Sequence, residues 1–283
     1  MCGNETFVDD VVFRLTFNTR ESMNSGVNDI INTIINTGKC GISYNSSIST
    51  KYIQITDIMS TGFKVGSILR GIYTRKGGAT YYINITFYGM RQYEVKKYNI
   101  TLTVLTSLIN FINEKDISYE IVELGIVTDF RDAFDKFLVV AVRKAPNCKY
   151  NSLKKIERDK QFKGSFYVEA FNPKQRKYAL KYGVLFDKQL RDYSVKNIDK
   201  VSSLTRFKLK IQPRWFITKT LSKKAIEKLL NSYKIIKFTT LKHKEVFAKS
   251  EIINVDKVNG GTCCVIDMSN VEKFIKDVCK IEI

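Results

Sequence analysis

The sequence has little of what zinc-binding proteins need. It contains one histidine, His243, and six cysteines, none of which forms a Cys-x-x-Cys pair. Zinc ribbons and zinc fingers are excluded, because they need four Cys or His ligands at characteristic spacings. The sequence also lacks a signal peptide and any apolar run of about 18 residues, the length that spans a bilayer. We therefore expect a cytoplasmic protein with reduced thiols and no membrane segment.

Acidic residues are scarce in the second half of the chain. Residues 1–140 contain 14 Lys and Arg and 14 Asp and Glu. The rest of the chain contains 33 of the 47 Lys and Arg but only 14 of the 28 Asp and Glu. The net charge of +19 therefore lies entirely after residue 140. Charge that served only solubility would be spread over the whole surface. Its confinement favours a face that binds a polyanion, with nucleic acid as the first candidate.

Strand-like and helix-like apolar spacings are interleaved along the chain. The first half predicts strands at 7–17, 52–58, 67–75, 80–89, 117–130 and 137–144, and helices at 27–38 and 100–115. The second half predicts strands at 165–171, 177–188 and 204–212, a Lys-rich helix at 221–234, and a final helix capped by Asp267, Ser269 or Asn270. We expect an α+β fold whose two sheet-plus-helix halves have mostly antiparallel strands and form a pseudo-repeat.

A polar, Lys-rich segment marks the expected division between the halves. The predicted N-terminal half covers 1–144 and is net neutral, a basic linker covers 145–163, and the C-terminal half covers 164–283 and is strongly basic.

The stretch from Tyr178 to Arg214 concentrates the positive charge on strand-like runs. In its LTRFKLKIQ segment, apolar residues alternate with basic ones, and a sheet would bury the first set and present the second as a row of positive charge. The residues that we expect to contact nucleic acid are Arg206, Lys208, Lys210, Arg214, Arg176, Lys177 and Lys181.

Several segments, taken in order, resemble the rolling-circle replication initiators of plasmids and filamentous phages, of the replication-initiation-factor or Rep_trans type. The resemblance covers about residues 80–220 and begins with ITFYGMRQYE at 85–94. The VELGIVTDF strand at 122–130 is similar to the Arg-x-Asp-x-x-x-Asp strand of that family. GVLFDK at 183–188 stands where the family has Tyr-Asp-Lys, and LTRFKLKI at 204–211 stands where it has Thr-Arg-x-Glu.

This resemblance implies nicking of one DNA strand by a tyrosine, assisted by Mg²⁺ or Mn²⁺ held on carboxylates. Three of the implied groups differ in this chain. Gly125 stands at the first Asp, Phe186 at the tyrosine and Lys208 at the Glu, while Asp129 matches the second Asp. Lys208 would add a positive charge where DNA phosphates are expected.

Three hypotheses follow for the function. We favour a DNA-binding protein of a mobile element whose nicking activity is weakened or absent. The first alternative is an active nicking initiator that uses Tyr182, ahead of Tyr178 or Tyr193, with Lys188 nearby and Asp129 as a remnant metal ligand. For Asp129 itself, the start of a turn is the slightly favoured interpretation. The second is an RNA-binding protein that uses the same basic face. The expected partner is duplex or hairpin DNA, and the sequence leaves open whether the chain forms a homodimer.

Overall fold

The computed structural model describes residues 4–45, 54–75, 78–89, 95–141, 165–168, 180–187, 204–211, 233–249, 259–264 and 266–280. The strands are β1 (Asn4–Phe17), β2 (Gly41–Asn45), β3 (Gln54–Ser60), β4 (Phe63–Arg75), β5 (Gly78–Phe87), β6 (Tyr119–Phe130), β7 (Phe137–Ala141), β8 (Ser165–Val168), β9 (Leu180–Asp187), β10 (Thr205–Ile211), β11 (Tyr233–Phe238) and β12 (Gly261–Cys264). The helices are α1 (Arg20–Asn36), α2 (Val95–Glu114), the 3₁₀ turn η1 (Phe134–Lys136), α5 (Leu241–Lys249) and α6 (Ser269–Asp277).

Two sheets organise these elements. One has nine strands in the order β2-β3-β4-β5-β1-β6-β10-β9-β8, and the other has three in the order β12-β11-β7. The pairings β1–β5, β4–β5, β9–β10 and β7–β11 are antiparallel. The predicted α+β class with mostly antiparallel strands is confirmed.

The chain divides into two compact units. Unit 1 comprises 1–7, 126–211 and 221–271, and unit 2 comprises 8–125, 212–220 and 272–283. Most of the neutral half therefore belongs to unit 2, and most of the basic half to unit 1. The division of the chain by charge into 1–144 and 164–283 stays a prediction, and the expected linker at 145–163 lies outside the described residues.

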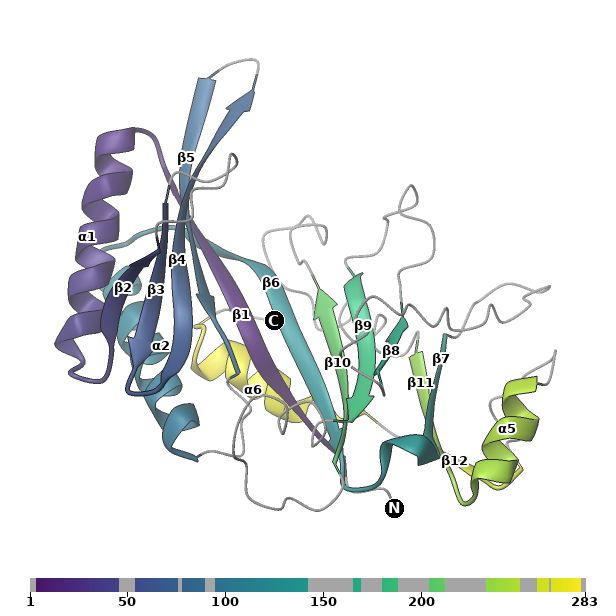
Figure 1. Ribbon diagram of the computed structural model, residues 1–283. Helices are drawn as coiled ribbons and strands as arrows, with labels where there is room; N and C mark the ends of the chain where they lie inside the picture. The colour runs from purple at the N-terminus through teal and green to yellow at the C-terminus, as the bar shows by residue number, and fades with distance from the viewer. Residues whose placement is uncertain are drawn as a thin grey trace. The chain divides into compact units, whose positions relative to one another are not determined.

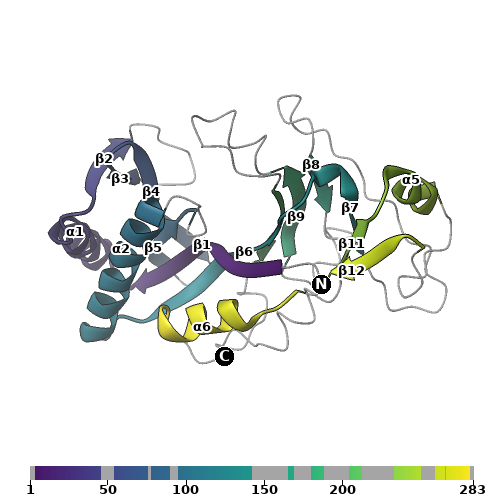
Figure 2. The ribbon, with the colours of Figure 1, turned by 90° about the horizontal axis from the view of Figure 1, so that it is seen from below.

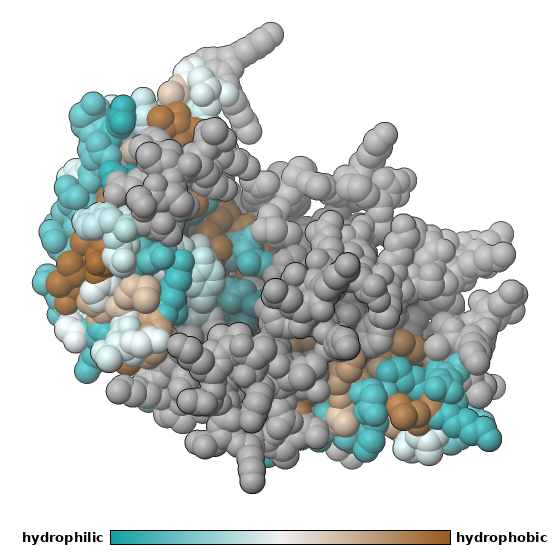
Figure 3. All heavy atoms as spheres, in the orientation of Figure 1, coloured by the Kyte–Doolittle hydropathy of each residue, from teal (hydrophilic) through white to brown (hydrophobic). Residues whose placement is uncertain are grey.

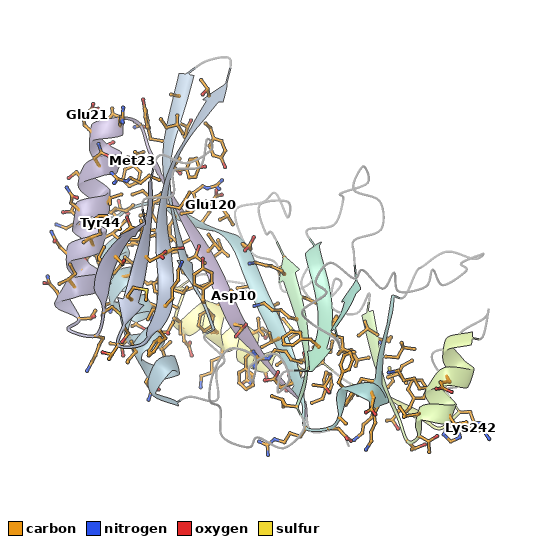
Figure 4. All side chains as sticks on the ribbon, in the orientation of Figure 1. Asp10, Glu21, Met23, Tyr44, Glu120 and Lys242 are labelled. Atoms are coloured by element: carbon orange, nitrogen blue, oxygen red, sulfur yellow. The ribbon has the colours of Figure 1, made fainter. Side chains whose placement is uncertain are left out.

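In unit 2, α1 illustrates how the local sequence forms its element. The Thr19 hydroxyl accepts a hydrogen bond from the Ser22 backbone N–H at 3.1 Å, and the Ser22 hydroxyl accepts one from the Thr19 N–H at 3.3 Å. This reciprocal cap satisfies two N–H groups that a helix start leaves unpaired. Figure 4 shows Met23 on the sheet side of α1 and Glu21 on its outer side, and Met23 is fully buried.

Helices α1 and α2 pack against each other and cover one face of the unit 2 sheet, which Figures 1 and 2 show from two directions. Gly26 of α1 lies close against the sheet, because a Cβ there would lie 2.8 Å from the Phe17 ring and 3.8 Å from Ile83. Phe13, Ile83 and Ile85 share that covered face and are fully buried. Over the outer surface of α1, Figure 3 shows mainly hydrophilic residues with separate apolar patches.

Several element boundaries differ from the sequence prediction, and two of the differences have a clear physical or structural reading. Helix α1 begins at Arg20 rather than at 27, because the Thr19 cap starts it before the apolar periodicity becomes regular. Tyr233 and Lys234, which the pattern assigned to the end of a Lys-rich helix, belong to β11. At α6 the predicted cap is confirmed, since the Asp267 carboxylate accepts a hydrogen bond from the Ser269 N–H at 2.9 Å.

Candidate nucleic-acid interface

Within unit 1, the three segments that carry the motif resemblance lie on neighbouring strands. The order β6-β10-β9 places the strand of Asp129 beside that of Thr205 and Arg206, and this beside the strand of Phe186. Arg206 is in register with Phe186, and Lys208 with Val184. Segments more than 70 positions apart in the sequence therefore meet on one sheet.

Asp129 and Arg206 form a buried ion pair between β6 and β10. The Arg206 Nε donates to Asp129 Oδ1 at 2.6 Å, and its Nη2 donates to Oδ2 at 2.8 Å. The two side chains are only 4% and 3% exposed. Two parallel charge-assisted hydrogen bonds compensate part of the large cost of removing both charges from water.

The exposure expected for Arg206 is wrong. Alternation along β10 assigned Arg206 to an outward row, but its relative exposure is 2%. The reason is the neighbouring strand, because Asp129 on β6 supplies the carboxylate that makes burial of the guanidinium tolerable. Its predicted contact with nucleic acid is not tested by this arrangement and stays a prediction.

The rest of β10 follows the predicted alternation. Phe207, Leu209 and Ile211 are buried, and Lys208 and Lys210 between them are half-buried. Their side chains are thus partly open to solvent, as a phosphate-binding row requires. Lys210 is in register with Tyr182 on β9.

Tyr182 and Asp129 occupy distant rows of this sheet. Tyr182 is four residues along β9 from Phe186, and Phe186 is the residue in register with Arg206. Four strand residues span about 13 Å, so the backbone of Tyr182 lies well away from the Asp129–Arg206 row. Phe186 itself is 3% exposed.

The remaining predicted residues fall outside what the structure describes. For Lys181 the strand is described but the side chain is not, and the same holds for Tyr182. The residues outside the described ranges are Lys188, Arg176, Lys177 and Arg214.

Asp132 follows β6 and joins several elements of unit 1. Its carboxylate accepts hydrogen bonds from the Ala133 N–H at 2.8 Å and lies 3.0 Å from Lys136 Nζ and 2.6 Å from Lys237 Nζ. Its backbone carbonyl accepts a hydrogen bond from the Thr205 hydroxyl at 2.8 Å. Burial alone would raise the pKa of Asp132, but the hydrogen bonds from Lys237, Ala133 and Lys136 lower it to about 2. No pattern in the sequence indicates this role of Asp132.

Gly125, in unit 2, has no room for a side chain. A Cβ at this position would lie 2.8 Å from Asp10 Oδ2 and 3.2 Å from Asp10 Cβ. Asp10, on β1, is 6% exposed and is labelled in Figure 4. The carboxylate of Asp10 therefore occupies the space that the side chain of an Asp at 125 would need.

The residues at the matched motif positions do not fit a Mg²⁺ or Mn²⁺ site. Both Asp129 oxygens accept hydrogen bonds from one guanidinium, and the position of the expected Glu holds Lys208. In the described part of the chain, no three His, Cys, Asp or Glu residues are grouped as metal ligands would be. A divalent ion prefers several carboxylate or carbonyl oxygens, and protonated lysine repels it.

Among the described helices, none is both long enough and apolar enough to cross a membrane.

The chain has structural similarity to a solved protein but matches no family model and no curated protein. The chain is similar to the structure of a rolling circle replication initiator protein from Geobacillus stearothermophilus, at 13% sequence identity and a TM-score of 0.43. The similarity covers 84% of this chain and 88% of the other.

Proposed function

We propose that the chain binds DNA through the β10 face of unit 1, as a relative of rolling-circle replication initiators whose nicking activity is weakened or absent. The observation that carries this proposal is the Asp129–Arg206 pair, with hydrogen bonds of 2.6 and 2.8 Å. It joins the two matched motif positions across neighbouring strands. It also engages the carboxylate that a metal would need.

Further support for weakened nicking comes from the other motif positions. Phe186 has no hydroxyl to attack a phosphodiester, and Lys208 has no carboxylate. Gly125 is packed against Asp10. Each change removes a nucleophile or a negative charge, and none removes a group that attracts phosphate.

Support for DNA binding comes from charge. All of the net charge of +19 arises after residue 140. Lys208 and Lys210 lie on one strand face with partly open side chains. Lysines in such a row bind phosphates by releasing condensed counterions, so the affinity falls steeply as salt rises.

The binding test compares the wild type with a Lys208→Gln, Lys210→Gln variant on a fluorescein-labelled DNA duplex, by anisotropy over a range of salt concentrations. We expect the variant to bind more weakly and the slope of log K against log salt to fall by roughly two units. The matched control is Lys39→Gln, Lys115→Gln, which removes two exposed lysines from unit 2. Equal losses in both variants would overturn the proposed interface.

The nicking test uses supercoiled DNA that carries the sequence flanking the coding gene, with Mg²⁺ or Mn²⁺. We expect no covalent protein–DNA adduct above background. An adduct that disappears in Tyr182→Phe would establish the active-initiator alternative instead. Tighter binding to structured RNA than to duplex or hairpin DNA at matched salt would establish the RNA-binding alternative.

A further inference from the structure

The β4–β5 hairpin of unit 2 is a long, regular ribbon. It is paired without interruption from Gly66 with Phe87 to Arg75 with Gly78. Figure 1 shows its end rising beyond the start of α1. Of the described helices of unit 2, neither α1 nor α2 extends along this end of the hairpin in Figure 1.

One face of this ribbon carries a group that we call the Arg14 cluster, made of Arg14, Tyr73, Tyr82 and Asn84. The register pairs Arg14 with Asn84 across β1 and β5, and Tyr82 with Gly71 across β5 and β4. These positions alternate with Phe13 and Ile83, which are buried on the face that α1 covers. The Arg14 cluster therefore lies on the face opposite α1.

The Arg14 cluster is a preformed group in which the Tyr73 and Tyr82 rings stack on each other and the Arg14 cation lies beside both rings. The Arg14 guanidinium carbon lies 4.7 Å from the centroid of Tyr82 and 5.2 Å from that of Tyr73, and the two rings stack at 4.5 Å with an interplanar angle of 24°. Arg14 Nε donates to Asn84 Oδ1 at 2.9 Å. These contacts fix the guanidinium and both rings before any ligand arrives.

A glycine makes this stack possible. A Cβ at Gly71 would lie 2.3 Å from Cζ and Oη of Tyr82, so the tyrosine ring lies directly over the glycine backbone. Tyr82 is 3% exposed, whereas Tyr73 above it is half-buried. The stack thus has a covered inner ring and an outer ring that is partly open to solvent.

The hairpin carries no carboxylate, because residues 58–93 contain no Asp or Glu. They contain five basic residues: Lys64, Arg70, Arg75, Lys76 and Arg91. Of these, Lys64 pairs with Asp57 at 2.6 Å, and Arg70 lies on the face that α1 covers, where it donates to Asn24. On the face of the Arg14 cluster, the nearest carboxylate along β1 is Asp10, four residues and about 13 Å from Arg14. A polyanion meets no like charge from the hairpin itself.

We propose that the Arg14 cluster is a binding site for single-stranded DNA, in which an unpaired base stacks on Tyr73 and continues the stack of Tyr82 and Tyr73, while the Arg14 cation lies beside it. Aromatic rings beside cations are how proteins hold single strands, because every base has a flat face that a ring can cover. A duplex hides those faces within its own stack. The site therefore selects single strands over duplex.

This inference goes beyond the proposed function, because it concerns another unit, another set of residues and another form of DNA. The proposed function and the single-strand site can be disproved independently of each other. Loss of duplex binding in the Lys208→Gln, Lys210→Gln variant tests the β10 face alone, and single-strand binding by Tyr73 variants tests the Arg14 cluster alone.

The experiment measures binding of fluorescein-labelled oligo-dT of about 15 nucleotides by anisotropy, with a duplex of equal length as the second probe. We expect Tyr73→Ala to weaken oligo-dT binding about tenfold and to leave duplex binding unchanged. Tyr73→Phe keeps the ring and should bind oligo-dT within about twofold of wild type, which also reports that the hairpin folds.

The matched control is Tyr44→Ala. Tyr44 is on β2 and is 66% exposed. The register from Tyr44 through Thr56 and Ile68 to Ile85 places it on the sheet face opposite the Arg14 cluster. It should leave oligo-dT binding unchanged. The proposal is overturned if Tyr73→Ala binds oligo-dT as tightly as wild type, if it loses duplex affinity by the same factor, or if Tyr44→Ala loses as much.

Discussion

Asp129 and Arg206 stand 77 positions apart in the sequence and are joined inside unit 1 by two hydrogen bonds, at 2.6 and 2.8 Å. A buried pair of this kind costs much more when one partner is lost than when both are replaced, because the surviving charge is left in an apolar setting.

The first prediction concerns that asymmetry. Arg206→Met should lower the free energy of unfolding by about 3–5 kcal/mol, because it removes both hydrogen bonds that Arg206 donates to the buried Asp129 carboxylate. The double variant Asp129→Leu, Arg206→Met should recover most of the loss. Urea unfolding followed by circular dichroism measures both. Arg20→Met, at an exposed position that starts α1, is the control and should change stability by less than about 0.5 kcal/mol. A double variant no more stable than the single one would contradict the prediction.

A second prediction follows from the lowered pKa of Asp132, about 2 in the folded protein against an ordinary value of 3.8. Because the folded pKa lies below the unfolded one, the stabilisation is complete above about pH 4 and is lost as the pH falls towards 2. The stability difference between wild type and Asp132→Asn should therefore shrink between pH 5 and pH 2.5 in urea unfolding.

Lys237→Gln removes one donor to the same carboxylate and should show the same trend with a smaller amplitude. A difference that stays constant over this pH range in both variants would show that the carboxylate charge has no part in stability.

The third prediction tests the packing of Gly125 against Asp10. Gly125→Ala should destabilise the protein by about 1–3 kcal/mol, because its Cβ would lie 2.8 Å from Asp10 Oδ2. Gly125→Asp should be worse, since it adds a second carboxylate to the same buried space. Thermal unfolding measures both changes. Combining Gly125→Ala with Asp10→Ala removes the contacts with Oδ2 and Cγ of Asp10 and should relieve part of the clash, because the Cβ of residue 10 remains 3.2 Å away.

Gly41→Ala is the matched glycine control, because nothing lies within 4 Å of a Cβ built there. If Gly125→Ala is no more destabilising than Gly41→Ala, the space beside Asp10 is larger than the structure indicates.

The fourth prediction concerns Tyr119, whose hydroxyl donates a hydrogen bond to the backbone carbonyl of Cys279 after α6. Burial, with a smaller contribution from Cys279, raises the pKa of Tyr119 to about 12. The folded pKa is above the unfolded value of 10, so this stabilisation is present below pH 10 and is lost as the pH rises to 12. Tyr119→Phe should lose about 1 kcal/mol at pH 8.

At pH 11.5 the wild type and Tyr119→Phe should be closer in stability than at pH 8, as chemical unfolding at the two pH values would show. If the difference in stability between the two proteins increases with pH, the raised pKa of Tyr119 is contradicted.

Much of β10 could be predicted from the sequence, because strand alternation depends only on nearest neighbours along the chain. Phe207, Leu209 and Ile211 are buried as the pattern indicates. Arg206 does not follow this alternation, because its environment is determined by Asp129 on another strand. A pattern of period two contains no information about which distant strand becomes the neighbour.

The Arg14 cluster was beyond sequence reasoning for the same physical reason. Its members come from β1, β4 and β5, and only the register of three strands brings Arg14 over Tyr73 and Tyr82. One signal was available, namely the absence of Asp and Glu between residues 58 and 93. A charge count over residues 1–140 does not show this local excess of basic residues, because acidic residues elsewhere in the same half balance it.

Asp132 also links the two sheets of unit 1, and this link affects how they separate during unfolding. Its carbonyl is bonded to Thr205 in the nine-stranded sheet, and its carboxylate to Lys237 in the three-stranded sheet. If the two sheets separate, Asp132 loses its bond either to Thr205 or to Lys237. Amide hydrogens in β10 and β11 should therefore exchange with solvent as one cooperative group, although the strands belong to different sheets.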